Sequence, residues 1–162
     1  MLGELHPQAL RIAEALKARR EKIAVADGAT GGLIGAALLT VPGALKFYVG
    51  GGIVYSFRAR DVLFALPPEA YDGMRSATPE YALLQARAIR DNFGADWGIA
   101  ETGSAGGSRH PLGVASGESA CAVVGPGVEL TRVTTTASDD RIANMGAFTR
   151  AALDLLEAAL AR

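Results

Sequence analysis

The sequence has few of the residues that build disulfide frameworks and metal sites. It contains one cysteine, Cys121, and two histidines, His6 and His110, in 162 residues. A single cysteine excludes an internal disulfide and is typical of a reducing compartment. These three residues match no zinc-binding pattern. We therefore expect no metal and no other cofactor, and we expect Cys121, in the apolar run SACAVV, to be buried and unreactive.

Long apolar runs and an excess of one charge are also missing. No apolar stretch reaches the roughly 18 residues of a membrane span, and the N-terminal MLGELHPQAL lacks the order of a signal peptide. The 16 basic and 17 acidic residues are interspersed and give a net charge of -1. These absences predict a cytoplasmic protein that binds neither membranes nor nucleic acid.

The hydrophobic content and its periodicity predict the fold class. Hydrophobic residues make up 49% of the chain, which suits one domain that buries roughly two thirds of the surface its unfolded chain exposes. Helices are expected at 8–20, 31–40, 56–66, 78–93 and in a last segment that follows Ser138. Strands are expected at 22–26, 46–55, 97–103 and, as a hairpin, at 119–125 and 128–137. This order predicts an α/β fold with a mixed sheet and helices on both faces.

Single residues mark where some of these elements begin. Pro7 suits the first turn of the first helix, Thr78 followed by Pro79 suits the start of another, and Ser138 suits the N-cap of the last helix. Three glycines interrupt the strand-like KFYVGGGIVY at 46–55. They predict a β-bulge or a close backbone approach in that strand.

Two predicted strands end in glycine-rich loops, KIAVA in DGATGG and WGIAE in TGSAGGSRHPLG. If the two strands are parallel, both loops emerge at the edge of the sheet where open α/β folds bind ligands. Their backbone N–H groups, with the hydroxyls of Thr30, Thr102 and Ser104, suit a phosphate. Neither loop has a Walker A or G-x-G-x-x-G sequence, so each also fits a plain tight turn.

Three further residues are candidates for the same site. Tyr55 and Arg60 in VYSFRARD follow a strand, and a guanidinium suits a phosphate or a carboxylate. Arg141 lies near the start of the last helix, where a positive charge opposes the helix dipole. The alternative is a tyrosine at the rim of the core with solvated arginines. A hydrolase built on Ser104 and His110 is disfavoured, because TGSAG departs from G-x-S-x-G at Thr102.

Five segments, in order, resemble the C-terminal domain of the CinA family over roughly residues 8–160. The family's A-E-S-C-T-G-G, P-G-S-S, Y-S-N-E-A-K, T-G-I-A-G-P and G-D-R have as counterparts ADGATGG (26–32), PGAL (42–45), YSFRAR (55–60), TGSAGG (102–107) and DDR (139–141). The resemblance implies a three-layer α/β/α sandwich, a single CinA C-terminal-like domain over 1–162.

The resemblance also implies an activity, the hydrolysis of nicotinamide mononucleotide to nicotinate mononucleotide and ammonia. In the family this chemistry is attributed to a serine of P-G-S-S and to the tyrosine and lysine of Y-S-N-E-A-K. Tyr55 matches the tyrosine. The serine position is Leu45, which has no nucleophile, and the lysine position is Arg60, which keeps its proton near pH 7. Both departures predict a weakened or absent amidase reaction.

The positions suited to holding a ligand are better retained than those suited to attacking it. Losing a nucleophile and its base typically costs about 10⁶ in turnover, whereas losing a neutral hydrogen bond costs about 1 kcal/mol. Gly28 replaces one more family serine, that of A-E-S-C-T-G-G. The residues expected to line a nucleotide site are Gly28, Thr30, Gly31, Thr102, Gly103, Ser104 and Arg141.

Three functions follow from these observations. The first is a CinA-like domain that binds a nicotinamide mononucleotide-like ligand, with amidase activity reduced or lost. The second is a working amidase in which Ser56, Ser104 or Asp27 activates the attacking group. The third is a non-catalytic protein-interaction module, with a second copy of the chain as one possible partner in a homo-oligomer.

Overall fold

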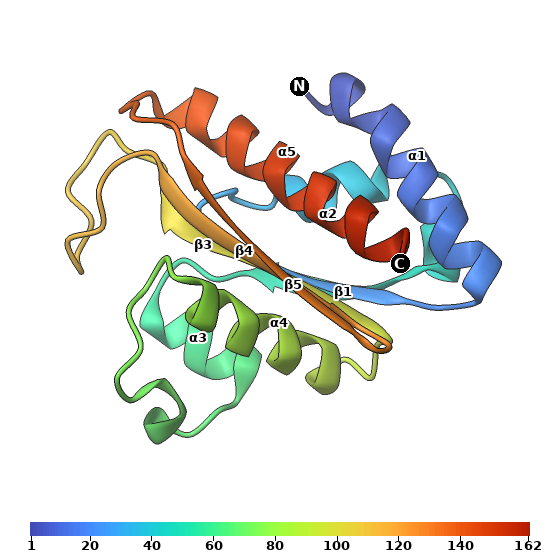
Figure 1. Ribbon diagram of the computed structural model, residues 1–162, viewed down its shortest axis with the longest axis horizontal. Coiled ribbons are helices and arrows are strands. Elements are labelled where there is room, and N and C mark those ends of the chain that lie inside the picture. Colours follow the sequence, from blue (N-terminus) through green and yellow to red (C-terminus); the bar gives the residue numbers. More distant parts are fainter.

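The computed structural model, which describes residues 1–162, is built on one five-stranded sheet (Figure 1). The strand order is β2 (Tyr48–Ile53), β1 (Ile23–Asp27), β3 (Trp97–Ser104), β4 (Glu118–Gly125) and β5 (Val128–Thr135). β1 pairs in parallel with β2 and with β3, whereas β3–β4 and β4–β5 are antiparallel. The sheet is therefore mixed, as predicted.

Helices cover both faces of this sheet (Figure 1). One layer holds α1 (Leu2–Arg19), α2 (Leu33–Leu39) and α5 (Arg141–Leu160), and the other holds α3 (Phe57–Phe64) and α4 (Pro79–Asn92). Short 3₁₀ helices lie at Ala44–Lys46 and Pro68–Tyr71. None of the helices has both the length and the apolar character that crossing a membrane requires. The three-layer α/β/α prediction is confirmed.

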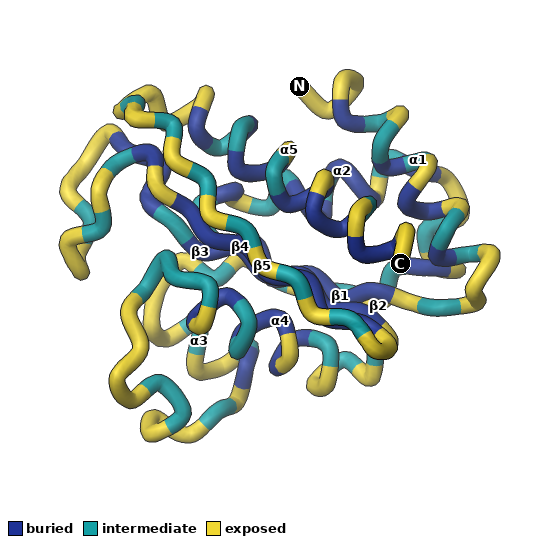
Figure 2. The backbone as a smooth tube through the Cα atoms, in the orientation of Figure 1, coloured by how far each residue is buried: buried dark blue, intermediate teal, exposed yellow.

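The two layers enclose separate cores with different side chains. The core under α1, α2 and α5 contains the large rings of Phe47 and Trp97. The core under α3 and α4 is mostly alanine, with Phe64 and Ile89 as its large members. The central strands are buried on both faces, and β1 is buried at every position, whereas the edge strand β5 alternates (Figure 2). Continuous burial explains why KIAVA has no polar alternation.

Trp97, the only tryptophan of the chain, anchors the start of β3. Its side chain is 1% exposed, and its indole N–H donates to Glu21 at 2.6 Å. Its ring lies so close to Gly125 that a Cβ there would come within 2.3 Å of it. The glycine before the hairpin turn is thus required by the tryptophan beside it.

β2 shows both features predicted for this strand. A Cβ on Gly51 would lie 1.9 Å from the carbonyl oxygen of Val25. The register between the two strands also shifts between Ile23 and Ala24. The expected close approach and the expected irregularity are therefore both present.

The first two helices begin at other residues than the sequence predicts. α1 begins at Leu2, so Pro7 lies inside the helix. The early turn is held because Leu5 is buried and because its N–H donates to the carbonyl of Met1. α2 begins at Leu33, because Gly31 and Gly32 have φ values of 65° and 97°, outside the helical region.

The two predicted serine and threonine caps have different outcomes. Thr78 caps α4 as predicted and accepts from the N–H of Tyr81. The prediction for Ser138 is wrong, since Asp140 caps α5 and accepts from the N–H of Ala143 at 3.1 Å. The hydroxyl of Ser138 instead accepts from the N–H of Asp140, the residue that precedes the first turn of α5.

Replacing Gly98 by alanine should destabilise the fold by about 2 kcal/mol or more, because the new Cβ overpacks the contact between β3 and α4. That Cβ would lie 2.1 Å from the carbonyl oxygen of Ala86 and 2.8 Å from Cβ of Arg90. Gly3→Ala is the control, since nothing lies within 4 Å of its Cβ position. Urea unfolding of the two variants measures the difference, and equal stabilities would contradict the close packing.

Candidate functional site

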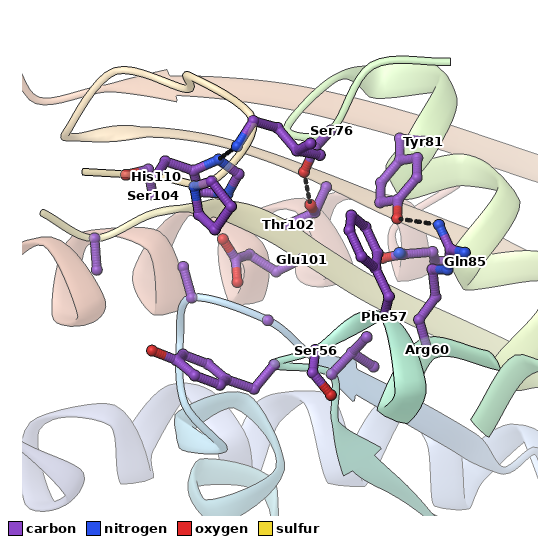
Figure 3. A pocket seen from close by; sticks show the side chains of 18 of the residues that line it. Ser56, Phe57, Arg60, Ser76, Tyr81, Gln85, Glu101, Thr102, Ser104 and His110 are labelled. Carbon is purple, nitrogen blue, oxygen red and sulfur yellow. Dashed lines mark hydrogen bonds between the residues drawn. The ribbon is translucent and has the colours of Figure 1, made fainter. Parts of the chain in front are cut away.

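The two glycine-rich loops meet at one edge of the sheet, since β1 and β3 are parallel. A pocket of about 420 Å³ opens there (Figure 3). Its walls come from the loop after β1, the segment 54–57 and Arg60, one side of α4, the end of β3 with its loop, and the start of α5. The predicted candidates that line it are Tyr55, Arg60, Gly28, Thr102, Gly103, Ser104 and Arg141.

Three candidates lie outside the lining of this pocket: Leu45, Thr30 and Gly31. Leu45 belongs to the 3₁₀ helix before β2, and its side chain is 82% exposed. Gly31 lies against α5, where a Cβ would come within 2.7 Å of the methyl group of Met145. Its positive φ and this contact give Gly31 a role in loop packing.

Thr30 and Asp27 hold the first loop against α2. The carboxylate of Asp27, only 3% exposed, accepts from the hydroxyl of Thr30 at 2.6 Å and from the N–H groups of Ile34 at 2.9 Å and Gly35 at 3.1 Å. Burial raises the pKa of Asp27, and these hydrogen bonds act against that shift. The oxygens that would serve a general base are thus occupied by the start of α2.

Gly28 and Gly103 allow the strands and loops around the pocket to approach closely. A Cβ on Gly28 would lie 2.3 Å from the carbonyl oxygen of Glu101, and one on Gly103 would lie 2.7 Å from the carbonyl oxygen of Glu118. Both glycines are therefore needed for the geometry of the site.

Arg60 forms part of the pocket wall and is held between aromatic rings. Its guanidinium carbon lies 3.8 Å from the ring centroid of Tyr71 and 4.8 Å from that of Phe57. It also pairs with Asp61 at 2.9 Å and donates to the hydroxyl of Tyr81 at 3.4 Å (Figure 3). Cation–π contacts and an ion pair fix the guanidinium in one place, where it presents a permanent positive charge.

Arg141, the first residue of α5, ties the second loop to the helix. One of its guanidinium nitrogens donates to the carbonyl oxygen of Gly106 at 2.7 Å, and Asp139 accepts from the N–H of Gly107 at 2.8 Å. Arg109 and His110 lie on the same loop and also line the pocket. The loop side of the pocket is therefore basic.

The hydroxyl groups of Tyr55, Ser56 and Ser104, which all line the pocket, lie in different surroundings. Tyr55 is 82% exposed at the pocket, and Ser56 caps α3 by accepting from the N–H of Ala59. Ser104 is buried, but it lines the pocket. Among the proposed substitutes for the missing nucleophile, Ser104 is the one that neither caps a helix nor lies outside the pocket.

Glu101, which was not among the predicted site residues, lies on β3 and lines the pocket. One carboxyl oxygen accepts from the hydroxyl of Ser119 at 2.5 Å and the other from the N–H of Thr30 at 3.0 Å. Burial raises the pKa of Glu101 to about 7, against the effect of these hydrogen bonds. A signal was available, because Glu101 is the one acidic residue in the otherwise apolar WGIAE.

Glu101 should make the folded protein less stable as the pH rises. Its pKa is higher in the folded protein than in the unfolded chain, so stability is lost between about pH 4.5 and pH 7. The shift corresponds to at most about 3 kcal/mol. Glu101→Gln should remove this part of the pH dependence, whereas Glu118→Gln, at an exposed position of β4, should leave it. Urea unfolding at several pH values checks this, and identical profiles for both variants would contradict it.

Comparison with known proteins gives one consistent result. The family model of the CinA C-terminal domain matches residues 6–160. A CinA-like protein of Myxococcus xanthus is 32% identical over 133 residues, which are 81% of this chain and 32% of that protein. The chain thus spans about a third of this curated relative.

Solved structures agree. A competence-damaged protein (CinA) superfamily protein from Klebsiella pneumoniae has a TM-score of 0.87 at 26% identity, and the match covers 97% of this chain and 98% of that one. The competence/damage inducible protein CihA of Agrobacterium tumefaciens has the same fold, with a TM-score of 0.88 at 23% identity over 98% of this chain and 96% of its own. With the family model covering nearly all of its residues, the chain belongs to the CinA family and corresponds to its C-terminal domain.

Proposed function

We propose that the pocket binds a nicotinamide mononucleotide-like ligand and that the family's amidase reaction is reduced or lost. The observation that carries this proposal is the combination of three arginines, Arg60, Arg109 and Arg141, around one pocket of about 420 Å³. That volume is in the range of small-molecule sites. Guanidinium groups bind phosphate through charge-assisted hydrogen bonds.

The aromatic side chains of the pocket suit the other end of such a ligand. Tyr55 is 82% exposed and Phe57 is 54% exposed, so both rings have accessible surface. A nicotinamide ring joined to ribose is a cationic pyridinium, which stacks favourably on an aromatic face. The pocket therefore offers groups for the phosphate and for the base.

The surroundings of Leu45 and Arg60 support the loss of the usual reaction. Leu45 carries no hydroxyl and points into solvent outside the pocket lining. Arg60 is fixed by Asp61 and by two aromatic rings, and it cannot act as a base near pH 7. Binding needs neither a nucleophile nor a base at these positions.

Arg109→Ala and Arg141→Ala should each weaken the binding of nicotinamide mononucleotide about 10-fold or more, because each removes a charged donor to the phosphate. Calorimetric titration measures the change. Arg58→Ala is the matched control, since Arg58 is exposed on α3 and lies outside the pocket lining. Nicotinamide riboside, which lacks the phosphate, should bind the variants and the wild type equally. If the wild type gives no heat of binding with nicotinamide mononucleotide or nicotinate mononucleotide at millimolar concentration, the proposal is contradicted.

A second candidate, hydrolysis by a different route, is favoured by Glu101 and Ser104 in the same pocket. A carboxylate with a pKa of about 7 can take a proton from water or from a serine as it attacks the carboxamide carbon. The same carboxyl group would then return the proton to the leaving ammonia.

An ammonia assay separates the two candidates. On the proposed function, the wild type releases ammonia from nicotinamide mononucleotide only slowly or not at all between pH 6 and 9. Release that disappears in Glu101→Gln and in Ser104→Ala, but persists in Arg58→Ala, would replace the proposal by the second candidate.

A further inference from the structure

Glu101 is the one acidic side chain among the residues that line the pocket; Arg60 and Arg141 lie on α3 and α5, and Arg109 lies on the loop that follows β3. In Figure 3 its carboxyl group points toward the space near Ser104 and His110, away from Arg60 and Tyr81. The pocket thus has basic walls and a single carboxyl group at the end of β3. A ligand that matches it carries an anionic group and, separately, a hydrogen-bond donor.

We propose that Glu101 is a specificity-determining residue that accepts a hydrogen bond from a carboxamide or amine of the ligand and excludes a carboxylate at the same place. This inference rests on the proposed function, because the ligands compared are the amide and acid forms of the same pyridine mononucleotide. The inference adds to the proposed function the side chain that distinguishes the amide from the acid.

The carboxyl oxygens have acceptor capacity left for a ligand. Each accepts one hydrogen bond from the protein, from Ser119 or from the N–H of Thr30, and a carboxylate oxygen can accept two. A Cβ on Gly28 would lie 3.2 Å from one oxygen, and a Cβ on Gly103 would lie 2.9 Å from the other. Glu101 is 1% exposed, but it lines the pocket together with both glycines, so a ligand group reaches its oxygens where these residues carry no side chain.

The groups around Glu101 do not neutralise it. Asp27 on β1 is a second acid and raises the pKa of Glu101. Cys121 is its partner across β4, and burial raises the pKa of that thiol to about 12, so it stays neutral. Partial burial lowers the pKa of His110, and Tyr81 is directed to Arg60. Neither Glu101 oxygen forms a hydrogen bond with Arg60, Arg109 or Arg141, so no guanidinium directly neutralises a second negative charge beside it.

This arrangement makes discrimination depend on pH. A ligand carboxylate binds beside Glu101 only when Glu101 holds a proton, so its affinity falls about tenfold for each pH unit above the pKa of Glu101, which is about 7. A carboxamide donates to the ionised form and has no such loss. The phosphate titrates in both ligands, so its contribution cancels when the two dissociation constants are divided.

The test is calorimetric titration of nicotinamide mononucleotide and nicotinate mononucleotide at pH 6.5 and pH 8.5. For the wild type, the dissociation constant of the acid divided by that of the amide should rise roughly 20-fold between these pH values, as a group with a pKa of about 7 requires. In Glu101→Gln, which keeps the shape of the side chain, the ratio should be the same at both. Glu118→Gln, exposed on the same sheet, should behave as the wild type does.

Each outcome decides the matter. A ratio that does not change with pH in the wild type overturns the role of Glu101, and that measurement needs no variant. A ratio that still rises in Glu101→Gln overturns it as well. If neither mononucleotide binds the wild type, the proposed function fails and this inference fails with it. If both bind with equal affinity at both pH values, the proposed function stands and only the specificity role of Glu101 is overturned.

Discussion

The parallel pairing of β1 with β3 is the constraint on which the rest of this structure depends. It places the two strand ends side by side, so that the loops after Asp27 and Ser104 share one edge of the sheet. The same pairing lets the N–H of Thr30, on the first loop, donate to Glu101 on the neighbouring strand. The pocket, the orientation of Glu101 and the close packing at Gly28 all follow from this register.

Two buried carboxyl groups near this edge illustrate how environment separates residues of similar chemistry. Asp27 is enclosed by the first turn of α2, which with Thr30 supplies three donors to its two oxygens, and it lies outside the pocket lining. Glu101 has two donors and faces the pocket. The first group is structural, and the second keeps acceptor capacity for a ligand. Whether a carboxyl group at this edge can accept a hydrogen bond from a ligand therefore depends on the loops around it and not on the residue type.

Much of the fold could be predicted because its signals are local. The apolar run of β1 and the Thr78–Pro79 start of α4 each specify their structure within a few residues. The start of α1 was missed because burial of Leu5 holds a turn that Pro7 would otherwise end. Asp140 and Ser138 are both good capping residues, and propensity alone did not distinguish them.

The site was harder to predict because its parts come from five places in the chain. Ser104, at the end of β3, and Arg141, at the start of α5, could be predicted to line the pocket because glycine-rich turns and misplaced charges are visible in a sequence. Glu101 was not found, because its burial and its contact with Ser119 exist only once β3 and β4 pair. Leu45 is exposed although Phe47, two residues later, lies in the core. The short 3₁₀ helix that turns Leu45 outward could not be predicted from the spacing of apolar residues.

The position of Trp97 has a practical consequence for studying this protein. The strand β3 carries its only indole at one end and Glu101 toward the other, beside the ligand pocket. The indole contacts Glu21 and Gly125, within the core beneath α1, and none of the pocket-lining residues is adjacent to it in sequence. Intrinsic fluorescence excited at the indole therefore reports the integrity of the sheet. Because the indole lies outside the pocket lining, its emission follows unfolding of the sheet, and ligand binding is followed by a separate measurement such as calorimetry.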